Sequence, residues 1–292
     1  MDFLAALMDP SLPFVRNALI AGILSSVLFG VLGSVVTVKR IAGLAGAISH
    51  AVLGGIGLAL FLAAKGLAPG FPPIAGALVF AVLSAALIGV VSLKAKQRED
   101  TVINAIWAVG MSIGVLFIAK TPGYADPMSY LFGNILLISG QDLILMAVLS
   151  ALVVAGAWRF YPQIEASSFD EEFARTRGVR TDSVFLAILA VVAVSVVLLQ
   201  TFVGIVMVIA MLTLPSGTAG YAARNLRGMM ILASVLSALF SVGGLALSWQ
   251  ANLPSGAVVV VLSGAVFLGA SGFRMLADRW RSRRNPGRPA EK

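Results

Sequence analysis

Hydrophobic residues form long stretches along this chain, separated by short polar segments. Several stretches reach about 20 residues, the length at which an α-helix crosses a hydrocarbon core about 30 Å thick. The pattern predicts nine membrane-spanning helices, or eight if the residues flanking Gln200 form one broken element. The predicted spans are Phe14–Val38, Ile41–Ala64, Pro72–Leu93, Val102–Ala119, Leu143–Trp158, Ser183–Leu199, Phe202–Ala219, Met229–Trp249 and Gly256–Phe273. We therefore expect an all-α fold, a polytopic membrane helix bundle of 8–9 transmembrane helices in a single domain over residues 1–292.

The basic residues predict how this bundle is oriented. The chain is 59% hydrophobic and 12% charged, whereas soluble domains carry about 25% charged residues. With nine spans, 18 of the 21 Lys and Arg residues fall in alternate loops and the C-terminal tail. Because basic residues gather on the cytoplasmic side, the N-terminus is expected outside and the C-terminus inside. The net charge of +8 then reflects membrane topology, and no nucleic-acid partner is expected. The basic tail, about residues 275–292, is expected to be disordered beside anionic membrane lipid headgroups.

One predicted span carries the only histidine of the chain. In the stretch GLAGAISHAVLGGIG, His50 shares a helical face with four glycines, which are Gly43, Gly46, Gly54 and Gly57. Such a face allows a second helix to approach closely. Ionisable groups at membrane depth are costly and are typical of functional sites. Two interpretations remain open here: His50 either donates a hydrogen bond between helices or binds a transition metal, for which imidazole is a common ligand.

Three residues near Gln200 are further candidates for a transport path. Met207 and Met211 could add soft thioether ligands, although methionine in an apolar helix is usually core packing. Pro215 lies inside an apolar helix, where it either kinks a packing helix or forms part of a gate. No cysteine is present, which excludes disulfides and thiolate metal ligands. The chain also lacks a Walker A motif and an H-E-x-x-H motif, so we expect neither enzymatic activity nor direct ATP binding.

A polar segment between two spans predicts a cytoplasmic surface helix over about residues 168–178. Ser168 and Glu171 have the spacing of a capping box, and Asp170 suits the positive start of a helix. Arg175 lies near its expected end, and Gly178 is a plausible terminating residue. This helix is either a solvated connector or a docking site for a cytoplasmic partner.

Taken with these features, several motifs resemble one family along essentially the whole chain. They are KRIAGLAGAISHAVLGGIGLAL, EDTVINAIWAVGMSIGVLF, YLFGNIL, FDEEFARTRGV, VGIVMVIAMLTLPSGTAGYAARN and LPSGA. In their order and spacing they resemble the membrane permease subunit of bacterial ABC importers for zinc, manganese and iron.

The resemblance implies a homodimer in the bacterial inner membrane, two cytoplasmic ABC ATPase subunits and an extracytoplasmic metal-binding protein. This chain would bind no cofactor of its own. The surface helix would be the coupling helix, contacting the ATPase through Asp170, Glu171, Phe173, Arg175 and Gly178. The outer segment would dock the binding protein through Tyr124, Asp126 and Tyr130.

The resemblance also assigns a role to the histidine face. The family's matching histidine faces the translocation path, commonly with an aspartate one turn earlier, where this chain has Gly46. Loss of that carboxylate shifts the expected metal toward zinc, ahead of manganese or iron. The path would be lined by Gly43, Gly46, Gly54, Gly57, Met207, Met211 and Pro215, with His50 as the metal ligand.

Three other functions fit parts of the sequence. An ABC permease for a metal chelate or corrinoid would suit the glycine face without needing a ligand. An ion-coupled secondary carrier would need carboxylates inside the spans and inverted repeats, and neither is visible. A membrane scaffold without transport would show no ATPase partner.

Overall fold

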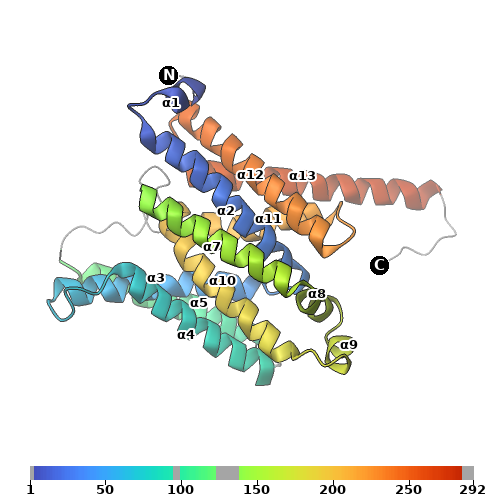
Figure 1. The fold of residues 1–292 in the computed structure, drawn as a ribbon, viewed down its shortest axis with the longest axis horizontal. Coiled ribbons are helices and arrows are strands. Elements are labelled where there is room, and N and C mark those ends of the chain that lie inside the picture. The colour runs from blue at the N-terminus through green and yellow to red at the C-terminus, as the bar shows by residue number, and fades with distance from the viewer. Residues whose placement is uncertain (1–2, 95–98, 123–137, 285–292) are drawn as a thin grey trace.

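The computed structural model describes residues 3–94, 99–122 and 138–284, and these form a bundle of α-helices (Figure 1). Eight of the helices are long and apolar enough to cross a membrane, which confirms the expected all-α membrane bundle. The helices are α1 Phe3–Met8, α2 Pro13–Val38, α3 Ala42–Ala64, α4 Pro73–Lys94, α5 Glu99–Lys120, α7 Gly140–Arg159, α8 Tyr161–Phe169, α9 Glu171–Thr176, α10 Thr181–Val203, α11 Ile205–Gly220, α12 Leu226–Ala251 and α13 Ser255–Arg284.

The break between α10 and α11 lies at Gly204 rather than at Gln200. Gln200 is buried within α10, whereas Gly204 has φ 82° and ψ 159°, a conformation that only glycine adopts readily. The following helix, α11, has 16 residues and is therefore about 24 Å long, short for a membrane span.

Contacts at one end of the bundle show that α11 nonetheless returns the chain across it. Arg175, just before α10, donates a hydrogen bond to Thr181 at the start of that helix. Arg227, at the start of α12, lies over the ring of Tyr161 in α8, 4.2 Å from its centroid. The starts of α10 and α12 therefore lie at the same end. Because α10 leaves this end and α12 begins there, α11 returns the chain to this end, in addition to the eight candidate spans of the described residues.

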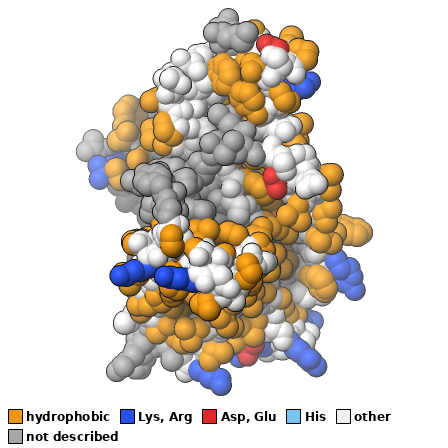
Figure 2. Space-filling model, turned by 90° about the vertical axis from the view of Figure 1, so that its left-hand side faces the viewer, with side chains coloured by type: hydrophobic (Ala, Val, Ile, Leu, Met, Phe, Trp, Pro, Cys, Tyr) orange, Lys and Arg blue, Asp and Glu red, His pale blue; other side chains and the backbone are white. Residues whose placement is uncertain are grey.

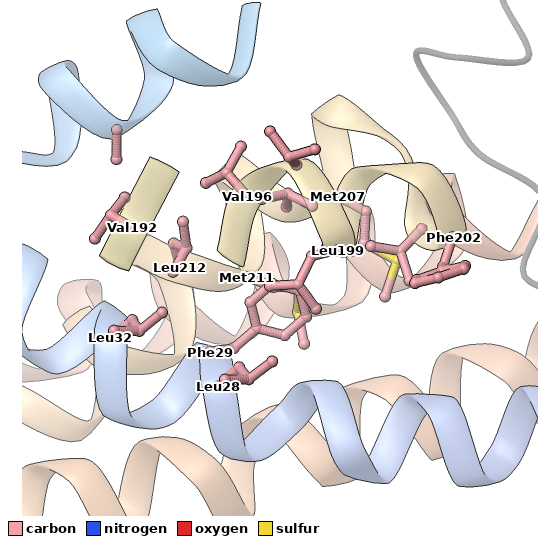
Figure 3. Close-up of a cluster of buried hydrophobic side chains, with 14 of the residues drawn as sticks. Leu28, Phe29, Leu32, Val192, Val196, Leu199, Phe202, Met207, Met211 and Leu212 are labelled. Carbon is pink, nitrogen blue, oxygen red and sulfur yellow. The ribbon is translucent and has the colours of Figure 1, made fainter. Parts of the chain in front are cut away.

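The core lies where α2 packs against α10, α11 and α12. Figure 3 shows this cluster, in which Phe29 and Leu28 of α2 face Leu199 of α10 and Met211 of α11. All four side chains are at most 1% exposed. The outside of the molecule is also largely apolar, and Figure 2 shows hydrophobic side chains spread over one face with Lys and Arg in small separate groups. This arrangement suits a protein surrounded by lipid.

Two local predictions need correction. The surface helix expected over 168–178 is divided at Asp170 into the end of α8 and the six-residue α9. The basic tail, expected to be disordered from about residue 275, continues α13 as a helix to Arg284. Apolar residues extend beyond Phe273 in the exposed Met275 and Leu276, which supports a longer helix than the predicted span.

Candidate functional site

The histidine helix α3 packs closely against α5, and glycines make this approach possible. A Cβ atom built on Gly54 would lie 2.8 Å from the carbonyl oxygen of Gly110, and one on Gly57 would lie 2.5 Å from that of Gly114. Both distances are shorter than a carbon–oxygen van der Waals contact, so a side chain at either position would force the helices apart. Gly54 and Gly57 are therefore packing positions within one chain.

The other two glycines of the same face have room for a side chain. A Cβ atom on Gly43 or Gly46 would have no atom within 4 Å, although Gly46 is buried and only Gly43 is exposed. The continuous seam expected from the sequence is thus divided, because α5 packs closely on the half toward the end of α3 and not on the half toward its start, which we call the open half. His50 lies between the two halves.

The ring of His50 stacks on Trp107 of α5, with centroids 4.5 Å apart and planes inclined by 13°. The two residues each occupy the ninth position of their helix, so they lie at equal depth. Trp107 is 41% exposed, and the half-buried histidine therefore sits at the edge of the α3–α5 contact. Among the described residues, the buried Nδ1 of His50 has no hydrogen-bond partner. The imidazole is thus fixed by stacking and keeps a free donor or acceptor atom.

No group of three or more His, Cys, Asp or Glu side chains in the described part of the chain is arranged to hold a metal. His50 therefore offers a single nitrogen ligand for a metal, next to glycines that contribute no side chain. In α11, Met207 and Met211 are 2% and 0% exposed and point into the core cluster (Figure 3). Pro215 is buried in the same helix. Met207 and Met211 therefore face the core, and all three side chains are buried within the single chain, which differs from the predicted path lining.

The surface element formed by α8 and α9 contains a cap that the sequence pattern placed two residues too early. Asp170, and not Ser168, caps α9, and its carboxylate accepts a hydrogen bond from the backbone N–H of Phe173. The hydroxyl of Ser168 instead donates to the carbonyl oxygen of Ile164 within α8. Gly178 follows the C-cap with φ 82°, in agreement with its predicted role as the terminating residue.

Arg175 holds this element to α10. Its Nε donates to Thr181 Oγ1 at 2.7 Å, and its Nη2 contacts Glu171 at 2.9 Å and Asp182 at 2.6 Å. Partial burial is the largest single effect on Glu171 and opposes its ionisation. The hydrogen bonds from Arg175 and Thr181 and the charges of Arg175 and Lys39 together outweigh burial and hold the pKa of Glu171 below its ordinary value. Arg175 and Glu171 therefore act within the chain, as a tie between α9 and α10.

A second tie joins the element to α2. Nζ of Lys39, directly after α2, donates to the carbonyl oxygen of Ser167 in α8 at 2.8 Å. Burial lowers the pKa of Lys39, and the charge of Glu171 partly opposes this shift. Together with the Arg227–Tyr161 contact, these ties fix α8 and α9 to the ends of three long helices.

Two phenylalanines project from the fixed element. Phe169 is 64% exposed at the end of α8, and Phe173 is 51% exposed on α9, with Arg177 over its ring at 5.2 Å. We call Phe169 and Phe173 the aromatic pair. The sequence singled out Phe173 alone, and it also did not identify Trp107 as the partner of His50. The predicted spans, which begin at Ile41 and Val102, place His50 and Trp107 at different distances from their starts, so the sequence contained no signal for this pair. Tyr124, Asp126 and Tyr130 lie outside the described residues.

The chain is similar over most of its length to known membrane transport proteins. Residues 11–274 match the ABC 3 transport family. An uncharacterized membrane protein of Synechocystis is 40% identical over 89% of this chain and 91% of its own length. The manganese transport system membrane protein MntC of Listeria monocytogenes is 31% identical over 91% of this chain and 92% of its own.

A solved structure agrees with the fold. PsaBC from Streptococcus pneumoniae, in complex with a Fab, superposes with a TM-score of 0.80 at 28% identity, covering 92% of this chain and 94% of that one.

Proposed function

The chain belongs to the ABC 3 transport family, the permease family of metal importers, and on this premise we propose that two copies of it form the path of a divalent metal ion. The observation that carries the proposal is the open half of the α3 face. There His50 presents an unpaired Nδ1 beside two positions without side chains, Gly43 and Gly46. Burying a polar nitrogen without a hydrogen-bond partner at membrane depth costs free energy. Such groups in membrane spans are therefore typical of functional sites.

A second copy of the chain would supply the second imidazole that one chain lacks. Two imidazoles facing each other across this open half, with water or carbonyl oxygens completing the coordination, would give a weak and open metal site. An importer needs such a site because a closed four-ligand cage would hold the ion too long. Neutral imidazole is the ligand, so protonation of His50 in acid would compete with the metal.

Zinc remains the metal that the donor set favours, with manganese or iron next. Imidazole without a neighbouring carboxylate suits zinc better than manganese. Two relatives are nevertheless named for manganese, MntC of Listeria monocytogenes and ScaB of Streptococcus parasanguinis. The test below therefore measures the uptake of both zinc and manganese.

Energy would come from separate ABC ATPases that dock on the aromatic pair. Exposed aromatic side chains that enter a pocket of a partner commonly carry about 2 kcal/mol or more of binding energy. The pair projects from an element tied to α2, α10 and α12, so a movement imposed there reaches the bundle. In this arrangement, the end of the bundle that carries α8 and α9 is cytoplasmic and the N-terminus lies on the outer side of the bacterial inner membrane. A metal-binding protein delivers the ion to the outer face.

The test is uptake of zinc and manganese by cells that express the chain together with its transport partners. His50→Ala and His50→Gln should abolish uptake at equal membrane abundance, because glutamine can replace a hydrogen bond but not a metal-binding imidazole. Ser49→Ala is the matched control, since the Ser49 hydroxyl bonds only the carbonyl oxygen of Ala45 in the same helix. Wild-type uptake of both metals by both His50 variants would reduce His50 to a packing residue.

A further inference from the structure

A long groove runs between α2, α7 and α10, away from the histidine face. Its volume is about 1010 Å³, at the upper end of ordinary small-molecule pockets. Its walls are almost entirely apolar, and they include Leu32, Leu149, Val153, Val184, Ile188 and Val191. Gly156 and Ala157 of α7 widen it, and a Cβ atom on Gly156 would have no atom within 4 Å.

The groove has the depth of one membrane leaflet. Its lining on α10 extends from Ser183 to Val194. From the first to the last of these positions an α-helix rises about 17 Å, and half of a hydrocarbon core is about 15 Å. The groove is also open sideways, because Leu152 is 66% exposed and Val191 is 40% exposed on its rim. Acyl chains could therefore enter it directly from the surrounding bilayer.

One end of the groove is polar and positively charged. Arg177 and Arg180, in the connection from α9 to α10, line this end, and neither pairs with a carboxylate in the described part of the chain. Guanidinium groups bind phosphate through paired hydrogen bonds. Gln163 of α8 lines the same end, and its buried Oε1 has no hydrogen-bond partner among the described residues. This oxygen needs a donor, which a phosphate diester cannot supply but a headgroup hydroxyl can.

We propose that this groove binds an anionic phospholipid with a hydroxyl-bearing headgroup, of the phosphatidylglycerol type. The acyl chains lie along α7 and α10, the phosphate meets Arg177 and Arg180, and a headgroup hydroxyl donates to Gln163. The charge and the depth favour this occupant over a protein segment, because a peptide at membrane depth would leave its backbone groups unsatisfied. The inference goes beyond metal transport and needs neither metal nor ATPase.

The site touches the proposed coupling surface. Arg177 lies over the ring of Phe173, 5.2 Å from its centroid, so a headgroup held by Arg177 sits directly behind the aromatic pair. A bound lipid would thereby fix the connection between α9 and α10.

The test is native mass spectrometry of the purified full-length protein, exchanged into a mixture of phosphatidylglycerol, phosphatidylcholine and phosphatidylmethanol with identical acyl chains. Phosphatidylmethanol is an anionic phosphate diester without a headgroup hydroxyl. We expect retention of phosphatidylglycerol above both others. Arg177→Gln and Arg180→Gln should each weaken its retention about fivefold, since a basic residue near anionic lipid contributes roughly 1 kcal/mol. Arg224→Gln, an exposed arginine outside the groove, is the control for general surface charge.

Two further variants separate the parts of the site. Gln163→Leu should abolish the preference for phosphatidylglycerol over phosphatidylmethanol while keeping the preference for anionic lipid. Gly156→Leu should lower retention of all three lipids by filling the groove, whereas Gly269→Leu, on the exposed side of α13, should not. Equal retention of phosphatidylglycerol and phosphatidylcholine would overturn the proposal. So would an equal loss with Arg224→Gln, or unchanged retention with Gly156→Leu.

Discussion

Two glycines that look equivalent in the sequence should respond in opposite ways to the same substitution. Gly46 and Gly57 lie on one face of α3, but only Gly57 contacts α5. A methyl group at Gly57 would lie 2.5 Å from the carbonyl oxygen of Gly114 and 3.0 Å from its Cα. The optimal separation of non-bonded atoms is about 3.5 Å or more, so the helices would have to part by about 1 Å.

The expected free energies follow from this geometry. Overpacking of a close contact costs about 1–3 kcal/mol, and replacing glycine by alanine in a helix returns up to about 1 kcal/mol. Gly57→Ala should therefore destabilise the fold by about 1–2 kcal/mol. Gly46→Ala meets no atom within 4 Å and should be neutral or stabilising by up to about 1 kcal/mol. For proteins of about 150–250 residues, a difference of about 2 kcal/mol corresponds to roughly 4–8 °C in Tm.

The assay is thermal unfolding of the purified permease in nanodiscs, without its ATPase. Tryptophan fluorescence provides a second readout in a background in which Trp158, Trp249 and Trp280 are replaced by phenylalanine, because separation of α3 from α5 would disturb the stack of Trp107 with His50. If Gly57→Ala unfolds at or above the wild-type temperature while Gly46→Ala unfolds early, the assignment of the two halves of the face is wrong.

Three further outcomes are expected. Gly46→Asp places a carboxylate one turn before His50 in open space, and manganese uptake should rise relative to zinc, measured by competition between the two metals. Phe173→Ala should lower transport-coupled ATP hydrolysis at least tenfold without loss of membrane insertion, whereas Arg175→Gln, which breaks the tie to α10, should keep ATPase binding and lose coupling. The folded-state pKa of Glu171 is lowered from 4.5, so its stabilising effect is complete above that pH and is lost on further acidification. Glu171→Gln should therefore reduce the acid dependence of Tm below about pH 4.5.

The helices themselves could be predicted from the sequence because a membrane span is a local property. Length and hydrophobicity set the spans, and the nine predicted spans fall on the eight long helices and α11. The break between α10 and α11 was misplaced by four residues. A polar side chain such as Gln200 interrupts a hydrophobic pattern without interrupting a helix, whereas Gly204 changes the backbone direction with little visible change in hydrophobicity.

Contacts between helices could not be predicted from the sequence in the same way. Periodicity identified the face shared by the glycines and His50, but not which helix covers it. That α5 covers Gly54 and Gly57 depends on Gly110 and Gly114, more than fifty residues later in the chain. The split of the surface helix at Asp170 is a similar case. Ser168 and Asp170 are both good caps, and the choice is made by the preceding α8, which extends through Ser168 and bonds its hydroxyl to Ile164.

His50, the proposed metal ligand, and the aromatic pair, the proposed ATPase contact, lie on different groups of helices. This arrangement limits the routes by which a movement at one can reach the other. The aromatic pair is fixed to α2, α10 and α12 through Lys39, Arg175 and Arg227. His50 belongs instead to α3, which packs mainly on α4 and α5. Movement imposed on α9 can reach α3 from α10 by direct contact between these two helices, or through α4, where Gly89 contacts the side chain of Leu186 of α10. The tight α3–α5 pairing makes those helices respond as a unit. In the proposed arrangement, a movement that an ATPase imposes on α9 would thus shift His50 and Trp107 together, opening or closing the proposed path without breaking their stack.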